Sequence, residues 1–180
     1  AVVAMVWTPF DPVHAVPSES LQGSSLTHLM GTDQYGRDVL SRVMDGARTT
    51  LTVAVASVLL SALIGVPLGV VAGMKRGWTD GLIMRTNDLL LAFPALLLAI
   101  VFTAVFGGSM WIVVLAIGIA GIPGFARVSR VGALQVMAQD YVLSARVSKV
   151  PGFLIAWRHV LPNIASTLAV QVSVALALIH

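Results

Sequence analysis

Residues 127–163 read R-V-S-R-V-G-A-L-Q-V-M-A-Q-D-Y-V-L-S-A-R-V-S-K-V-P-G-F-L-I-A-W-R-H-V-L-P-N. This helix-prone segment with a polar face connects two hydrophobic segments that are each long enough to cross a bilayer. A short turn would be enough to join two membrane spans, yet this connection has 37 residues. The extra length indicates that the segment has a function of its own.

The composition of the whole chain determines the class of protein. The sequence is 57% hydrophobic and 11% charged, with a mean hydropathy of +0.91. A soluble domain is usually about one-quarter charged, so much of this surface must face lipid. The absence of cysteine excludes disulfides and thiolate metal sites. The net charge of +3 comes from few basic residues gathered in two loops, which favours membrane topology over nucleic-acid binding.

Uncharged segments of 16 to 23 residues predict the membrane spans. The predicted spans are residues 51–73, 89–106, 109–126 and 164–180. The apolar residues 1–7 are interpreted as the end of a first span, so the chain is expected to be a fragment truncated at both ends. Because lipid offers no hydrogen-bond partners to the backbone, we expect one all-α, polytopic transmembrane domain.

Small and polar residues within the spans predict how the helices pack. Gly65, Gly69 and Gly73 recur every four residues and predict a bare helix face for close packing. Prolines are expected to bend three spans, at Pro67, Pro94 and Pro123. Interhelical hydrogen bonds are expected for Ser57, Ser61, Thr103 and Gln171. Gln171 is also a weak candidate for a residue that lines a translocation path.

Residues 8–50 form the only long polar region before the first complete span. We expect Asp33 to cap an amphipathic helix that starts near Gln34, with Asp38 and Arg42 paired one turn apart on its polar side. His14 and His28 lack the spacing of metal ligands, and no metal site is expected.

The distribution of basic residues predicts the topology. Eight of the eleven Lys and Arg residues lie in residues 74–88 and 127–163. Two predicted spans separate these loops, so both loops lie on the same side of the membrane. The positive-inside rule places both loops in the cytoplasm and residues 8–50 outside.

The long cytoplasmic segment is expected to have three parts. Residues 127–139 continue the preceding helix, residues 140–149 form a short helix capped by Asp140, and Pro151-Gly152 breaks the chain before it returns to the membrane. One interpretation is an amphipathic connector that lies on the lipid headgroups. The other is a docking helix that fits a groove of a cytoplasmic partner.

Three motifs resemble a known family. D-Y-V-L-S-A-R-V-S-K-V-P-G-F-L-I-A-W-R-H-V-L-P-N at 140–163 resembles the cytoplasmic EAA loop of permease subunits from binding-protein-dependent ABC importers. H-L-M-G-T-D-Q-Y-G-R-D-V-L-S-R at 28–42 resembles the dipeptide, oligopeptide and nickel branch. The similarity extends through G-W-T-D-G-L-I-M-R-T-N-D-L-L-L-A-F-P-A-L-L-L-A-I at 77–100. It implies an ABC importer permease fold, with six spans in the complete protein.

The resemblance implies a coupling helix that sits in a groove of an ATPase subunit. The family's Glu-Ala-Ala falls on Leu143, Ser144 and Ala145. The residues implied in ATPase coupling are Asp140, Tyr141, Leu143, Ser144, Ala145, Arg146 and Lys149. Lys149 stands where the family has a glycine, and a lysine reaches the left-handed turn of that glycine only at an energetic cost.

The implied function is a multi-pass permease subunit of a bacterial inner-membrane importer, most similar to those for peptides. The implied partners are a homologous second permease, two cytoplasmic ATPase subunits and an extracytoplasmic solute-binding protein, in addition to membrane lipid. The chain lacks G-x-x-x-x-G-K-[ST], so ATP and Mg are expected in the ATPase subunits and no cofactor in this chain. Alternatives are a permease for nickel or another small solute, and a structural membrane subunit. An intramembrane enzyme is disfavoured because the predicted spans lack paired catalytic groups.

Overall fold

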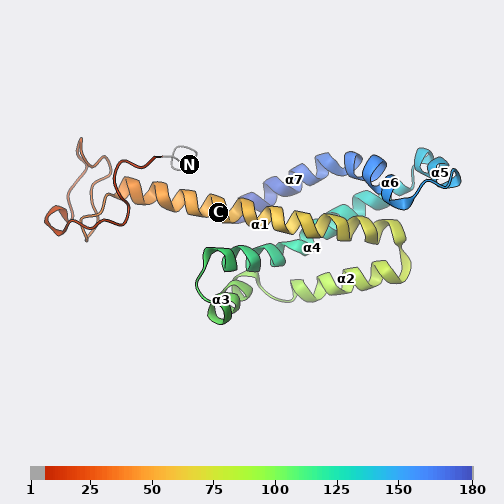
Figure 1. The fold of residues 1–180 in the computed structure, drawn as a ribbon, viewed down its shortest axis with the longest axis horizontal. Coiled ribbons are helices and arrows are strands. Elements are labelled where there is room, and N and C mark those ends of the chain that lie inside the picture. The colour runs from red at the N-terminus through yellow and green to blue at the C-terminus, as the bar shows by residue number, and fades with distance from the viewer. Residues whose placement is uncertain (1–6, 180) are drawn as a thin grey trace. The chain divides into compact units, whose positions relative to one another are not determined.

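The computed structural model describes residues 7–179. The expected end of a first span, residues 1–7, therefore lies outside the described residues except for Trp7. The helices, shown in Figure 1, are η2 (Pro17–Glu19), α1 (Val39–Lys75), α2 (Gly77–Leu91), α3 (Ala95–Phe106), α4 (Met110–Met137), α5 (Asp140–Val147), α6 (Gly152–Ile155), the π-helical turn η3 (Ala156–Val160) and α7 (Leu161–Ile179). Residues 7–179 contain no β-strand, only the isolated bridge between Thr32 and Asp38, and the all-α prediction is confirmed.

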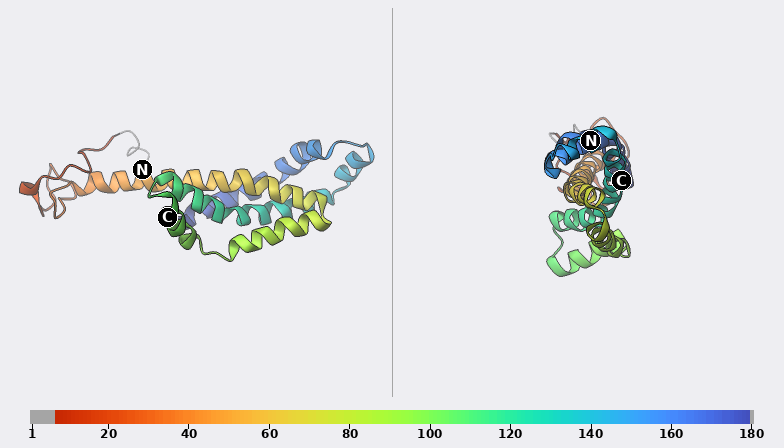
Figure 2. Two further views of the ribbon diagram at one scale, coloured as in Figure 1. Left: turned by 60° about the horizontal axis from the view of Figure 1, so that its bottom comes forward. Right: turned by 90° about the vertical axis from the view of Figure 1, so that its right-hand side faces the viewer.

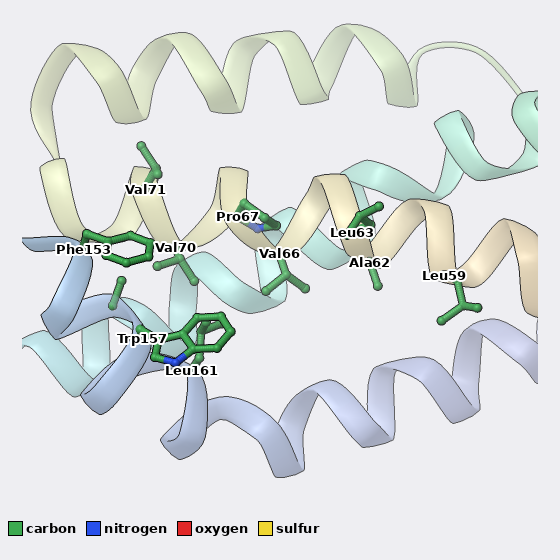
Figure 3. Close-up of a pocket in the computed structure, with 11 residues that line it drawn as sticks. Leu59, Ala62, Leu63, Val66, Pro67, Val70, Val71, Phe153, Trp157 and Leu161 are labelled. Atoms are coloured by element: carbon green, nitrogen blue, oxygen red, sulfur yellow. The ribbon is translucent and has the colours of Figure 1, made fainter.

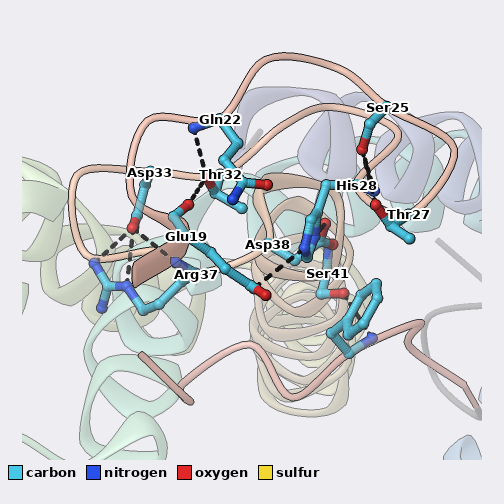
Figure 4. A network of polar contacts seen from close by, with 11 residues as sticks. Glu19, Gln22, Ser25, Thr27, His28, Thr32, Asp33, Arg37, Asp38 and Ser41 are labelled. Carbon is cyan, nitrogen blue, oxygen red and sulfur yellow. Dashed lines mark hydrogen bonds and ion pairs between the residues drawn. The ribbon is translucent and has the colours of Figure 1, made fainter. Parts of the chain in front are cut away.

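The chain divides into two compact units, Ala1–Thr52 and Val53–His180, which are described separately. In the first unit, Figure 4 shows a polar network that holds the loops before α1. Buried His28 contacts the carboxylate of Asp38 through Nδ1 at 3.0 Å and that of Glu19 through Nε2 at 3.4 Å. The Thr32 hydroxyl donates to the Glu19 carbonyl and accepts from the Gln22 N–H. These polar side chains bond to one another and stabilise irregular backbone.

The start of α1 differs from the prediction. The helix begins at Val39 rather than near Gln34, because Gly36 has φ +73° and interrupts helical backbone. Asp38, rather than Asp33, accepts the backbone N–H of Ser41 at 2.8 Å and acts as the cap.

The predicted pair between Asp38 and Arg42 is also wrong. Asp33 binds the guanidinium of Arg42 at 2.6 Å and that of Arg37 at 2.9 Å, whereas Asp38 is buried against His28. Desolvation opposes ionisation of Asp33, but the N–H groups of Arg37 and Tyr35 and the Arg37 guanidinium lower its pKa to about 2. The ionised carboxylate therefore organises the loop that precedes α1.

In the second unit, α4 is the central helix. It packs against α2, α3, α5, α7 and η3, and Figure 2 shows it running beside α1 in both views. Three helices in the described part of the chain are long and apolar enough to cross a membrane: Val39–Lys75, Met110–Met137 and Gly152–Leu178. The pair α2 and α3 is a fourth candidate if the two helices form one broken span.

Three glycines of α1 pack directly against α4, and we call this contact the glycine seam (Gly65, Gly69 and Gly73). A Cβ atom on Gly65 would lie 2.6 Å from the Ile122 carbonyl oxygen, and one on Gly69 only 2.2 Å from that of Ala126. The hydroxyl of Ser61 donates across the seam to the Gly118 carbonyl at 2.7 Å. Because these glycines have no side chains, the backbones of the two helices lie in close contact.

The prolines have different consequences along the chain. Pro67 lies within α1 and Pro123 within α4, and both helices continue through them. Pro94 instead precedes α3, and α2 and α3 meet at 78°. The predicted span 89–106 is therefore not one helix, because Pro94 has no N–H to continue the helical hydrogen bonding of α2.

The boundaries of the predicted loop and spans also differ from the prediction. Residues 74–88, predicted to be a loop, belong largely to α2. Residues 51–73 lie within the longer α1, 109–126 mostly within α4, and 164–179 within α7. Apolar length located these segments correctly, but the polar ends of α1 and α4 continue as helix.

Candidate functional site

The short helix α5 is the central element of the candidate site. It follows α4 after a two-residue link and is mostly exposed, as Figure 1 shows at one end of the second unit. Tyr141, Leu143 and Val147 are all exposed, and Val147 has 83% of its surface accessible. Ala145 is only half-buried. The helix therefore presents apolar and small side chains outward from a short element.

The N-terminus of α5 differs from the prediction. Gln139 has extended backbone and is the cap residue, whereas Asp140 is the first helical residue, and no side chain caps the terminus. The predicted cap at Asp140 is therefore wrong. In the first turn, the Asp140 carboxylate still interacts favourably with the positive end of the helix dipole.

The C-terminus of α5 ends in a Schellman motif. Lys149 has φ +57°, in the left-handed region. Its N–H donates to the Arg146 carbonyl at 2.9 Å, and the N–H of Val150 donates to the Ala145 carbonyl at 3.1 Å. The chain thus makes the turn that the resemblance places at a glycine, with a lysine in the strained conformation.

One residue of α5 anchors it to the rest of the unit. Val142 is fully buried, and it is the only buried residue of this helix. It belongs to a hydrophobic cluster that draws residues from α1, α4, α6, η3 and α7: Val70, Ala133, Val136, Met137, Val142, Ile155, Val160 and Ile164. One packed cluster therefore joins α5 to the three long helices α1, α4 and α7.

The return from α5 to the membrane contains a π-helical turn at Ala156–Val160. The N–H of Leu161 donates to the Ala156 carbonyl, five residues earlier. Pro162 has no N–H to offer the Arg158 carbonyl and its ring crowds that group, which accounts for the wider turn. This turn places the His159 ring 5.7 Å from the ring of Tyr141, a second link between α5 and the membrane-returning segment.

A second region concerns Gln171, the weak candidate for a translocation path. A cavity of about 270 Å³ within the second unit is lined by residues of α1, α3, α4 and α7, including Gln171 and Ser61. Gln171 lies against Gly124, where an added Cβ would be 3.2 Å from its Nε2. Ser57 and Ser61 donate to carbonyls of α4, as predicted, but Thr103 donates only within α3. The interhelical bond predicted for Thr103 is wrong.

Sequence reasoning missed several contacts that support the site. Arg130 of α4 binds Asp80 of α2 through two nitrogens, with Nε 2.5 Å from Oδ1, and Arg127 binds Asp88 at 2.6 Å. Asp80 and Asp88 fall in the predicted loop 74–88, whereas the structure places both in α2, where they face Arg130 and Arg127 of α4. The family motif does not mark Val142, which is fully buried between exposed Tyr141 and Leu143. Its apolar character in a polar segment was the available signal.

Comparison with known proteins agrees with this arrangement. Residues 65–179 match the family described as "Binding-protein-dependent transport system inner membrane component". The matched region includes the glycine seam and α5.

Curated relatives are similar over almost the whole chain. The chain is 39% identical over 171 residues to a glutathione transport system permease protein of Pectobacterium atrosepticum, covering 94% of this chain and 57% of the relative. It is 35% identical to a dipeptide transport system permease protein of Alkalihalophilus pseudofirmus, covering 95% and 56%. It is 35% identical to a di/tripeptide transport system permease protein of Pseudomonas aeruginosa, covering 93% and 57%. The chain thus spans little more than half the length of these relatives.

Proposed function

This chain belongs to the family of binding-protein-dependent transport system inner membrane components, and on this premise we propose that it is a permease subunit of an ATP-driven importer for di- or oligopeptides. It is a multi-pass protein of the bacterial inner membrane. The peptide substrate is supported by the names of three relatives, which transport glutathione, dipeptides and di- or tripeptides. Nickel or another small solute is the alternative substrate.

The main support for the proposal is that α5 is exposed on one face and anchored to the spans on the other. The helix exposes Tyr141, Leu143 and Val147 and buries Val142 in a cluster shared with the spans. A connector lying on headgroups needs no such rigid link to several spans. A surface that receives force from a partner needs both the exposed face and the link.

We assign the exposed face of α5 to a cytoplasmic ATPase subunit. The assembly then contains a homologous second permease, two ATPase subunits and an extracytoplasmic solute-binding protein. ATP and Mg bind to the ATPase subunits, and this chain performs no catalysis of its own. Closure of the ATPases moves α5, and the cluster around Val142 passes this movement to α1, α4 and α7. The cavity around Gln171 is then a candidate part of the translocation path, whose opening switches from the outside to the inside of the membrane.

Replacing Ala145 with glutamate tests this function. The larger charged side chain should hinder docking of α5, so peptide uptake by the complete complex should fall at least roughly tenfold while ATP hydrolysis persists. The matched control is Ala138→Glu, since Ala138 is exposed but lies outside α5. Unchanged peptide uptake by Ala145→Glu would contradict the proposal.

Two further measurements separate the alternatives. Uptake of a labelled peptide panel, with glutathione included and nickel as competitor, identifies the substrate. Uptake of labelled nickel together with absence of peptide uptake favours the nickel alternative. Deletion of residues 140–149 should abolish copurification of an ATPase subunit with the permease. Retained copurification would instead support a structural subunit that contacts its partners elsewhere.

A further inference from the structure

An apolar groove runs between α1 and the segment formed by α6, η3 and α7. Figure 3 shows Phe153, Trp157 and Leu161 on one side and α1 on the other. Its volume is about 540 Å³, and none of its lining side chains carries a charge. Phe153 is 79% exposed and Trp157 66% exposed. These large side chains border a groove that nothing in the described residues fills.

The groove continues into a second cavity that contains positive charge. The second cavity, of about 510 Å³, shares Val70, Val71, Phe153 and Ala156 with the first. It adds the side chains of Lys75 and Arg146. Among residues 7–179, no ion pair involves Lys75 or Arg146. The continuous space is therefore apolar along α1 and cationic where α1 ends.

We propose that this space binds one anionic glycerophospholipid. An acyl chain lies in the groove beside Val66 and Trp157, and the phosphate lies between Lys75 and Arg146. Lys75 directly follows the uncharged residues 51–74 of α1, a helix long and apolar enough to cross a membrane, so its ammonium group is expected at the depth of the headgroups. Basic pockets between membrane helices bind acidic headgroups, whereas an apolar helix would leave both cations without a counterion.

The bound lipid also links two functional elements. Lys75 ends α1, whereas Arg146 belongs to α5. A phosphate between them ties the short helix to a span at a point distinct from the Val142 cluster. This inference requires that α1 and α7 lie in the membrane, and it does not depend on the transported substrate or on ATPase coupling.

Native mass spectrometry of the complete protein complex tests the site. The complex is purified in detergent and exposed to equal amounts of phosphatidylglycerol and phosphatidylethanolamine. We expect one retained phosphatidylglycerol per copy of this chain. The double variant Lys75→Gln/Arg146→Gln should bind that lipid at least roughly tenfold more weakly. Arg85→Gln is the control, because Arg85 is an exposed cation outside both cavities.

A second measurement identifies the occupant directly. Phosphatidylglycerol with a photoactivatable acyl chain should label residues 59–71 and 153–161, and Val66→Trp should block this labelling by filling the groove. Equal retention of the two lipids, or unchanged binding in the double variant, would overturn the proposal. The same holds if a cysteine introduced at Leu63 crosslinks to another membrane helix, because a helix then occupies the groove.

Discussion

The glycine seam and α5 lie in the same unit but differ in packing: the seam is a close helix–helix contact, whereas α5 is mostly exposed. At the seam, a Cβ on Gly69 would be 2.2 Å from a carbonyl oxygen of α4, so the contact allows no larger side chain. In α5, one residue of eight is buried, and its C-terminus is closed by a lysine in a left-handed conformation. The seam therefore holds two long helices together, whereas α5 has one buried residue and leaves most of its surface exposed.

The largest expected effect is at the glycine seam. Gly69→Val places a branched side chain against the α4 backbone and should lower the free energy of unfolding by about 3 kcal/mol. Thermal unfolding of the purified complete protein measures this. The control Gly46→Ala changes a glycine of the same helix that has nothing within 4 Å, and it should stabilise the protein by about 1 kcal/mol. Equal effects of the two substitutions would show that the seam is not tightly packed.

The next effect concerns the anchor of α5. Val142→Ala leaves a void in the cluster and should destabilise this region by about 2 kcal/mol, because Val142 is fully buried. Val147→Ala is the matched control, since the same substitution at an exposed position of the same helix should change stability by less than about 0.5 kcal/mol. Hydrogen exchange of α5 amides reports both. Similar exchange in the two variants would mean that Val142 does not anchor the helix.

A smaller effect is expected at the end of α5. Lys149→Gly relieves the left-handed strain and should stabilise the turn by about 1 kcal/mol. Lys149→Val should destabilise it by at least as much, because branched residues are poorly tolerated at positive φ. Ser148→Gly provides the control, since Ser148 has a negative φ and gains nothing from glycine. Exchange of the Lys149 and Val150 amides is the measurement, and slower exchange in Lys149→Val than in Lys149→Gly would refute the assignment.

The smallest effect lies in the first unit and depends on pH. The pKa of Asp33 falls from 3.8 to about 2 on folding, so its ionised form stabilises the loop fully above about pH 4. This contribution is lost as the pH decreases through 2. Exchange of the Tyr35 and Arg37 amides, corrected for intrinsic rates, should accelerate between pH 4 and 2. Asp33→Asn should remove that pH dependence, and its persistence in the variant would assign it to another group.

The sequence predicted features that depend on local chemistry. Three of the four predicted spans lie within long apolar helices, the short helix at 140–149 is present as α5, and the positive φ of Lys149 occurs where the resemblance places a turning glycine. Features that depend on a distant partner were not predictable in this way. The pairing of Arg130 with Asp80, 50 residues apart, cannot be inferred from either residue alone. The break at Pro94 exceeds the expected bend because residues 92–94 leave the helix, as the proline disfavours helical backbone at the residue before it.

Cysteine crosslinking in membrane vesicles is the most direct test of the proposed docking of α5 on a cytoplasmic ATPase subunit. The 180 residues contain no cysteine, so a single one can be introduced at Ser144 on α5 or at exposed Leu82 on α2. We predict that the cysteine at position 144 crosslinks to the ATPase subunit with a yield that changes on ATP binding, and that the cysteine at position 82 does not. Crosslinking from position 82 alone, or from neither position in a complex that is active in transport, would show that α5 does not dock on the ATPase subunit.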